Sequence, residues 1–325
     1  MNGRKVFVHI AAVGMIAVVA STPIAHADLT LLSADSPLLG SDTAIIVGGT
    51  AEPTPSTAFA QTVEDLYLHP LGFDDSATYS AVCDMTATDP CSAPLQVLTT
   101  PELVQQGPSE LAGASDIVHA VENEFASNPD AFSAEHPLTV FGYSQGAAAD
   151  SIAMTQLAHD GIPSDELHFV FIGDPALPGG IWPNLEPDLD ALLGPSNANA
   201  FLDFLDPIFG VKDAIGEVTP DDLYPTTAYT LDGDGVANFQ ADYNSGGLLN
   251  IVLGGLAVHA SYLGLTASEV ADASASFSGD ITYLDIPGPI NELETLTGAL
   301  ENGLLSSGFL QSLFDSFEYA LHGVF

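Results

Sequence analysis

Basic residues are almost absent from this sequence. Only three of its 325 residues are lysine or arginine, whereas 43 are aspartate or glutamate. A nucleic-acid-binding protein needs basic surface to displace phosphate counterions, so we expect no nucleic-acid partner. Charge attraction to anionic lipid is excluded for the same reason. Beyond Arg4 no guanidinium is available to grip a carboxylate or phosphate, so we expect a substrate that is neutral or apolar near the reacting atoms.

Long apolar runs are also scarce, apart from one near the amino terminus. Arg4 and Lys5 precede a short apolar stretch, and Ala25-His26-Ala27 has the small-x-small pattern of a cleavage site. This order predicts a signal peptide over residues 1–27 and an exported chain that begins near Asp28. We therefore expect the protein to be secreted or associated with the cell envelope.

Cysteine is limited to Cys83 and Cys91, which are too few for a disulfide-rich scaffold. In an exported chain the two predict one disulfide, because the compartment is oxidising. Closing so short a loop should stabilise the fold by about 2.6 kcal/mol. The two cysteines have no histidine nearby, so a zinc site is not expected.

Short apolar runs alternate with helical patterns along the middle of the chain. Apolar runs bounded by turn residues predict strands, and apolar residues spaced three and four apart predict helices. Strands are expected at 43–49, 95–98, 138–141, 167–172, 226–231 and 281–286, and helices at 109–126, 146–159 and, in part, 246–258. This alternation indicates an α/β fold with a mainly parallel sheet and helices on both faces. The apolar face of the helix 109–126 is expected to comprise Leu111, Ile117, Val118, Val121 and Phe125.

The domain is expected to span residues 28–290. Residues 176–222 are rich in Pro, Asn, Asp and Gly, and we expect an irregular insertion or lid there. Residues 291–325 carry apolar residues at helical spacing, which predicts an amphipathic helical tail that packs on the domain. Contact of this tail with a membrane or envelope surface, or with a partner, is the alternative.

A serine lies where a predicted strand passes into a predicted helix. Residues 142–146 read Gly-Tyr-Ser-Gln-Gly. A tight strand-to-helix turn places its serine in a strained backbone above the sheet, and larger side chains at Gly142 or Gly146 would collide with neighbouring elements. Ser144 is therefore the candidate nucleophile, unless it only caps the following helix. The N–H of Gln145 would donate to an oxyanion, with a second donor expected near Gly49 and Thr50.

A serine nucleophile needs a histidine base and an acid that orients it, in the chain order serine, acid, histidine. Four histidines follow Ser144, and His259 fits this order better than His159, His168 or His322. Asp234 follows the predicted strand 226–231 and is the preferred acid. Asp174 and Asp232 remain alternatives. The Asp232-to-Gly235 segment lacks the other ligands of a calcium loop, so we expect neither metal nor cofactor.

Four segments together resemble the PE-PPE domain, a serine α/β-hydrolase family of mycobacteria and related actinobacteria that is similar to cutinases. They are Gly48-Gly49-Thr50 with Pro53-Thr54-Pro55, Gly142 to Gly146, Asp234 to Phe239, and Val258-His259-Ala260-Ser261-Tyr262. The resemblance covers residues 43–290 and implies Ser144, Asp234 and His259 as the triad. The sequence departs from the family at Asn238-Phe239-Gln240, where the family has Asp-Phe-Pro. A signal peptide is also expected where the family carries a PE or PPE helical module.

The resemblance implies a serine esterase or lipase that hydrolyses short- to medium-chain acyl esters. The same triad would also serve an acyltransferase acting on cell-envelope glycolipids. A non-catalytic envelope protein that retains the fold is the third possibility. The complete serine, aspartate and histidine set favours an enzyme over this third possibility.

Overall fold

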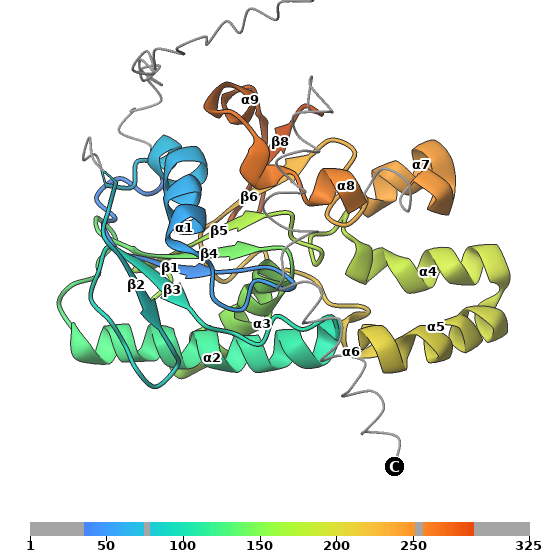
Figure 1. Ribbon diagram of the computed structural model, residues 1–325, viewed down its shortest axis with the longest axis horizontal. Coiled ribbons are helices and arrows are strands. Elements are labelled where there is room, and N and C mark those ends of the chain that lie inside the picture. Colours follow the sequence, from blue (N-terminus) through green and yellow to red (C-terminus); the bar gives the residue numbers. More distant parts are fainter. Residues whose placement is uncertain (1–35, 75–78, 251–255, 289–325) are drawn as a thin grey trace, which may run out of the picture.

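The computed structural model describes residues 36–74, 79–250 and 256–288 (Figure 1). The predicted signal peptide, the predicted carboxyl-terminal tail and His322 lie outside the described residues. Within the three described ranges, no helix is both long enough and apolar enough to span a membrane.

One eight-stranded sheet forms the centre of the fold, with the order β2-β3-β1-β4-β5-β6-β8-β7. Every neighbouring pair is parallel except β7 and β8. The strands are β1 Ala44–Val47, β2 Val82–Met85, β3 Leu95–Leu98, β4 Leu138–Tyr143, β5 Leu167–Ile172, β6 Thr226–Leu231, β7 Ser274–Ser278 and β8 Ile281–Ile286. The predicted α/β class and mainly parallel sheet are therefore confirmed.

The six predicted strands are all present, and β3, β5, β6 and β8 have the predicted bounds. The two strands that were not predicted, β2 and β7, are the edges of the sheet. An edge strand need not bury both faces, so it lacks the continuous apolar run that marks a central parallel strand. Strand β7, with the sequence Ser-Ala-Ser-Phe-Ser, is exposed along its whole length.

Helices cover both faces of the sheet (Figure 1). The α-helices are α1 Thr57–Val63, α2 Gln106–Ser127, α3 Gln145–Asp160, α4 Ile181–Leu193, α5 Pro195–Phe209, α6 Val211–Ala214, α7 Phe239–Asn250, α8 Leu256–His259 and α9 Ala267–Ala271. The described residues also include a π-helix, η1 Glu64–Leu68, and two 3₁₀ turns, η2 His69–Leu71 and η4 Tyr262–Gly264.

Consecutive strand residues supply the two halves of the core, because side chains alternate across a sheet. Val140 of β4 packs with Val121 and Leu157 in the cluster formed by α2 and α3. The next residue, Phe141, faces the other side and packs with Val63 of α1 and other residues of the second cluster. Burying both faces explains why the central strands read as unbroken apolar runs.

The sequence predicted that Leu111 lies on the buried face of the helix 109–126, and this prediction was wrong. The Leu111 side chain is 53% exposed, whereas Ile117, Val118 and Val121 are buried as predicted. In its first turns α2 turns Gly107 and Glu110 inward instead. Buried glycine and glutamate do not look apolar in a sequence, so the periodicity pointed to the wrong residue there.

The expectation of irregular structure in residues 176–222 was also wrong, because α4, α5 and α6 occupy most of this segment. Proline and glycine suggested loops, but Pro195 lies at the start of α5, where a missing N–H is tolerated. Trp182, Leu189 and Leu202 form a third cluster with Ala148 of α3 and Phe239. The pair α4 and α5 extends from one side of the sheet (Figure 1).

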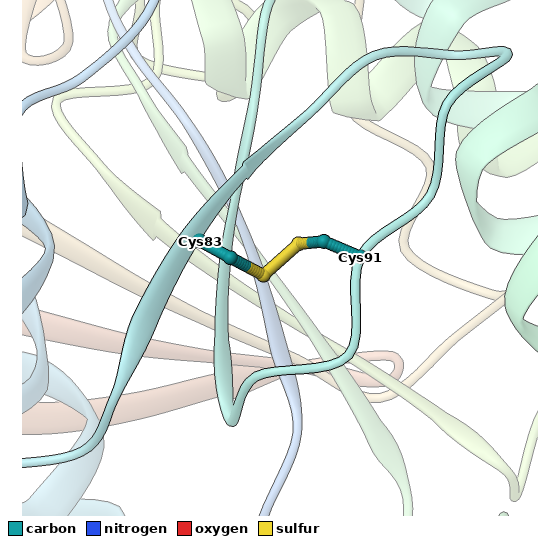
Figure 2. The surroundings of a disulfide bond; sticks show 2 residues. All are labelled: Cys83 and Cys91. Atoms are coloured by element: carbon teal, nitrogen blue, oxygen red, sulfur yellow. A yellow bond between two sulfur atoms is a disulfide. The ribbon is translucent and has the colours of Figure 1, made fainter.

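Figure 2 shows the predicted disulfide, which joins Cys83 of β2 to Cys91 in the connection to β3. The two Cα atoms are 6.3 Å apart. The bond therefore ties the edge strand to its own connecting loop, and the predicted pairing is confirmed.

Replacing both cysteines, Cys83→Ala with Cys91→Ala, should lower the free energy of unfolding by about 2.6 kcal/mol, since the unfolded chain regains the entropy of the open loop. Urea unfolding of the double variant and of the parent protein measures this difference. Dithiothreitol should lower the midpoint of the parent protein alone. Equal midpoints for the two proteins would contradict the prediction.

Buried carboxyl groups gather where residues 176–222 meet the rest of the core. Glu102, Glu110, Asp150 and Asp174 are at most 1% exposed. The indole N–H of Trp182 donates to Glu110 Oε1 at 3.1 Å.

No lysine or arginine of the described residues lies in this cluster to balance its charge. Glu217 is partly buried after α6, and its burial together with the neighbouring carboxyl of Glu110 raises its pKa. Lys212, the single lysine or arginine of the described residues, pairs with Asp203 instead. Burial raises the pKa of Glu102 to about 8 and that of Asp174 to about 6, and it also raises the pKa of both Glu110 and Glu217.

These raised pKa values predict a fold that loses stability in alkali. A carboxyl group whose pKa is higher in the folded than in the unfolded state binds its proton more tightly in the folded state. Its contribution to the free energy of unfolding is therefore fully present at low pH. It is lost as the pH rises through the folded-state pKa, which for Glu102 is about 8. A tenfold change in proton affinity corresponds to about 1.4 kcal/mol, so the stability lost between pH 5.5 and 9 should reach several kcal/mol.

Urea unfolding at a series of pH values measures this loss. The variant Glu110→Gln should flatten the dependence on pH, because the amide cannot ionise. The control Glu135→Gln changes an exposed glutamate and should leave the slope unaltered. A stability that is constant from pH 5.5 to 9 would show that these carboxyl groups are not held protonated.

Candidate active site

Ser144 lies on the turn between β4 and α3, with φ 53° and ψ −116°. A positive φ is strained for a residue with a side chain, and such strain is frequent at functional sites. A Cβ atom at Gly142 would come within 2.6 Å of Ala147 Cα, and one at Gly146 within 2.2 Å of the Gly48 carbonyl oxygen. The turn therefore has the strained serine and the two obligatory glycines that the sequence predicted.

The structure brings the three predicted triad side chains into one hydrogen-bonded chain. Ser144 Oγ lies 2.7 Å from His259 Nε2. On the other side of the ring, His259 Nδ1 lies 3.0 Å from each carboxylate oxygen of Asp234. The serine comes from the turn after β4, the aspartate from the loop after β6, and the histidine from the end of α8. This geometry allows His259 to accept the serine proton while Asp234 fixes its tautomer.

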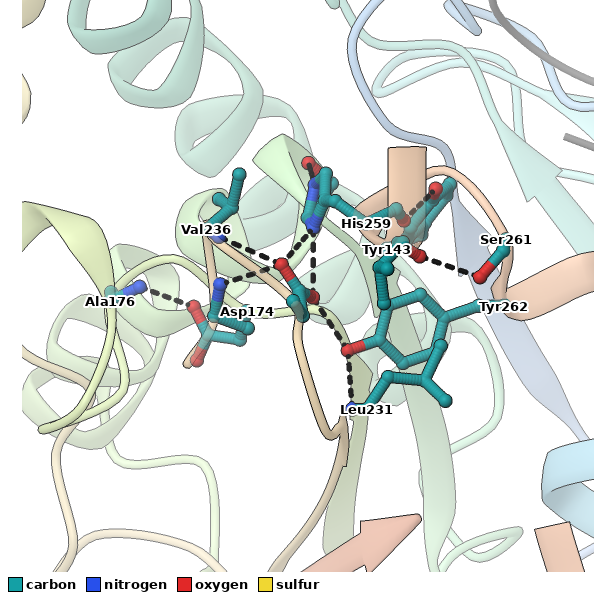
Figure 3. A network of polar contacts seen from close by, with 12 residues as sticks. Tyr143, Asp174, Ala176, Leu231, Val236, His259, Ser261 and Tyr262 are labelled. Carbon is teal, nitrogen blue, oxygen red and sulfur yellow. Dashed lines mark hydrogen bonds and ion pairs between the residues drawn. The ribbon is translucent and has the colours of Figure 1, made fainter. Parts of the chain in front are cut away.

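Asp234 is fully buried yet surrounded by donors. Its Oδ1 accepts the backbone N–H groups of Val236 at 2.8 Å and Ala237 at 3.1 Å. Burial by itself would raise the pKa of this carboxyl, but the charge of His259 and the hydrogen bonds outweigh it and hold the pKa below the usual value. Figure 3 shows Val236 and His259 around this carboxylate. The group is thus kept as an anion that can stabilise an imidazolium.

Neither alternative acid is arranged in this way. Both oxygens of Asp174 are engaged elsewhere. One accepts from the N–H of Ala176 at 2.8 Å (Figure 3), and the other accepts from the hydroxyl of Thr219 at 2.6 Å. Burial raises its pKa to about 6. Asp232 has an exposed side chain. Asp174 therefore orders the turn after β5.

The other candidate histidines of the described residues lie elsewhere. His159 is exposed at the end of α3, beside Asp160. His168 is buried in β5, with Nε2 3.1 Å from the Thr227 hydroxyl, and burial lowers its pKa to about 4. Neither is placed to take a proton from Ser144, which is already 2.7 Å from His259.

Two of the three predicted oxyanion-hole residues, Gln145 and Gly49, lie at the serine turn, and the third, Thr50, follows Gly49 in the chain. Gln145 is the first residue of α3, so its N–H has no partner within the helix. Its side-chain amide donates to the Leu103 carbonyl at 2.8 Å, which fixes the start of the helix. A Cβ at Gly49 would lie 3.2 Å from Ser144 Cβ, and the neighbouring Thr50 hydroxyl accepts from Gln106 Nε2 at 3.2 Å. Their role as donors to an oxyanion stays a prediction.

Sequence reasoning missed two residues that shape the site. Gly173, at the end of β5, has φ +62°, and a Cβ there would lie 3.0 Å from both His259 Cε1 and Tyr262 Cε2. The hydroxyl of Tyr143 donates to the main-chain carbonyl of His259 at 2.8 Å (Figure 3). Gly173 directly follows the predicted strand 167–172, but nothing in the sequence indicates that an imidazole packs against this glycine.

Gly173→Ala should displace the His259 ring, because its methyl group would overlap the imidazole. A shift of about 1 Å at a reacting group can lower the rate roughly 100-fold, so we expect kcat/KM to fall at least tenfold. Steady-state hydrolysis of p-nitrophenyl butyrate provides the measurement. Gly161→Ala is a matched control, since Gly161 has φ +88° but nothing within 4 Å of its added Cβ. If both variants lost activity equally, backbone strain rather than the contact with His259 would be responsible.

Comparison with known proteins places this geometry in a family. The model of the PE-PPE domain matches residues 91–290. Two similar proteins come from Mycobacterium tuberculosis (strain ATCC 25618 / H37Rv). Esterase PE16 is 30% identical over 279 residues, which cover 82% of this chain and 46% of that protein. The uncharacterized PPE family protein PPE28 is 29% identical over 240 residues, covering 73% and 32% respectively. The chain thus spans less than half the length of these relatives.

Among solved structures, a cutinase-like protein from Cryptococcus sp. shares 16% identity with a TM-score of 0.36, covering 86% of this chain and 97% of that one. The ester-hydrolase EH1AB1 from the metagenome of Lake Arreo shares 14% identity with a TM-score of 0.35, covering 89% and 76%. The fold is defined by the mainly parallel sheet with helices on both faces and by the strand-to-helix serine turn described above, which are typical of α/β-hydrolases. By its sequence match and this architecture, the chain belongs to the PE-PPE domain family.

Proposed function

We propose that this protein is a serine esterase or lipase that hydrolyses short- to medium-chain acyl esters. The observation that carries the proposal is the unbroken contact chain from Ser144 Oγ through His259 to Asp234, with distances of 2.7 and 3.0 Å. A serine hydroxyl becomes nucleophilic when a base can take its proton, and this arrangement supplies the base. Membership of a family in which one relative is named an esterase supports the same reaction.

The proposed reaction has two halves. Ser144 Oγ attacks the ester carbonyl carbon while its proton passes to His259 Nε2. Asp234 stabilises the imidazolium through Nδ1–H. The tetrahedral oxyanion receives the N–H of Gln145 and a second donor from Gly49 or Thr50. Collapse of this intermediate breaks the bond to the alcohol, which takes the proton from His259 and leaves. Water then attacks the acyl-enzyme in the same way and releases the carboxylic acid.

The charge of the protein restricts the substrate. Within the described residues Lys212 is the only lysine or arginine, and it lies in α6, paired with Asp203. A carboxylate or phosphate on the substrate would find no lysine or arginine of the described residues near Ser144 and would be repelled by the strongly negative net charge of the protein. An uncharged acyl ester fits this environment, and the carboxylate product is released from it readily.

We also propose that the protein acts outside the cytoplasm. The disulfide between Cys83 and Cys91 is typical of oxidising compartments, and the basic and apolar start of the sequence is typical of a signal peptide.

Ser144→Ala should lower kcat for p-nitrophenyl butyrate by at least about 10³-fold without unfolding the protein, because only the nucleophile is lost. In parallel, a fluorophosphonate probe should label the parent protein, and mass spectrometry should map the label to the peptide that contains Ser144. Ser164→Ala, which changes an exposed serine, serves as the control and should behave like the parent protein. Turnover that survives Ser144→Ala with native circular dichroism would refute the proposal.

A further inference from the structure

The acid of the triad has one partner that the sequence did not suggest. The hydroxyl of Tyr262 lies 2.7 Å from Asp234 Oδ2. Tyr262 is fully buried and follows His259 by three residues, so one short segment supplies both the base and this second contact to the acid. Figure 3 shows the phenol directed at the carboxylate from the side opposite Val236.

The direction of this hydrogen bond follows from its surroundings. The backbone N–H of Leu231 donates to the same Tyr262 hydroxyl oxygen at 3.0 Å. A backbone N–H can only donate, so the tyrosine oxygen is the acceptor in that contact. The hydroxyl proton is therefore free to point to Asp234, which as a carboxylate can only accept. The Leu231 N–H therefore donates to the Tyr262 oxygen, and the Tyr262 hydroxyl in turn donates to Asp234.

The tyrosine itself is held firmly. The hydroxyl of Tyr67 donates to the Tyr262 main-chain carbonyl at 2.7 Å, and both residues are fully buried. The Tyr262 ring meets the edge of the His259 imidazole, with centroids 6.3 Å apart and planes at 84°. Burial raises the pKa of Tyr262 well above the usual value, so its proton remains available to donate.

The two carboxylate oxygens consequently have separate supports. Val236 and Ala237 donate to Oδ1, whereas Tyr262 donates to Oδ2, and His259 Nδ1 lies 3.0 Å from both. Support on both oxygens fixes the plane of the carboxylate and thereby the orientation of the imidazole. Without the tyrosine hydroxyl, Oδ2 would keep only its contact with His259, and the carboxylate could rotate about its bond to Cβ.

We infer that Tyr262 is a positioning residue that holds Asp234 in the orientation needed to align His259 with Ser144. The inference rests on the proposed function, because it assigns the residue a part in the same triad. It does not make Tyr262 a catalytic residue, since the phenol touches neither Ser144 nor the reacting ester. Its effect passes through Asp234.

The test compares Tyr262→Phe with the parent protein, because this change removes the hydroxyl and keeps the ring. We expect the rate of fluorophosphonate labelling and kcat for p-nitrophenyl butyrate to fall about 10- to 100-fold, as is typical for a lost hydrogen bond to a charged group. The KM should stay within twofold. Tyr224→Phe is the matched control: Tyr224 is also buried, its hydroxyl donates to the Ile162 carbonyl at 3.1 Å, and it packs in the cluster of α2 and α3.

The same substitution in an Asp234→Asn background separates positioning from a general structural role. If Tyr262 acts through the carboxylate, Tyr262→Phe should slow labelling much less once that carboxylate is gone. An equal slowing in both backgrounds would overturn the inference, as would a folded Tyr262→Phe protein with parent-like kcat. A Tyr262→Phe chain that fails to fold would also count against it, because the hydroxyl would then serve the fold. If the parent protein takes up no label, it is the proposed function that fails.

Discussion

The close crossing of β4, α3 and the loop after β1 is the constraint on which the rest of the site depends. Gly146 lies so near the Gly48 carbonyl that a methyl group would come within 2.2 Å of it, and Gly142 lies equally tightly against Ala147 and Asp150. This crossing holds Ser144 at a positive φ and presents its hydroxyl to His259. The strain is stable because β4 is buried between its neighbours β1 and β5 and both helical layers.

A chain with so few cations has to bury its carboxyl groups in other ways, and this fold uses two. Asp234 stays ionised because backbone N–H groups, a tyrosine hydroxyl and His259 replace the water it has lost. Glu102 and Glu110 lie in a cluster without a cation, where burial raises the pKa and favours the protonated form. The environment of Asp234, which keeps the carboxylate ionised, suits a triad acid. The environment of Glu102 and Glu110, which favours neutral carboxyl groups, suits a packed contact between the core and residues 176–222. Hydrogen-bond donors rather than net charge therefore decide which carboxyl can serve the triad.

Much of the fold could be predicted from the sequence, since the central strands are buried on both faces and read as apolar runs. The edge strands β2 and β7 could not, because half-exposed strands lack that pattern. The helices of residues 176–222 were hidden by their proline and glycine residues, and their apolar side chains pack against Ala148 and Phe239. Leu111 was misplaced because a buried glutamate, Glu110, determines the inner face of α2 at that point.

The sequence by itself determined the serine turn, the order of the three candidate triad residues and the cysteine pair. The serine turn depends on local backbone geometry, and the other two features depend on the order and spacing of residues along the chain. Both kinds of information can be read directly from a sequence. Chain order favoured Asp234 over Asp174, but only the tertiary structure shows that Asp234 contacts His259 whereas Asp174 is bonded to Thr219. It alone also brought Gly173 beneath the imidazole and Tyr262 against the acid. Such contacts join segments that are far apart in the chain, so they leave no periodic pattern of apolar residues in the sequence.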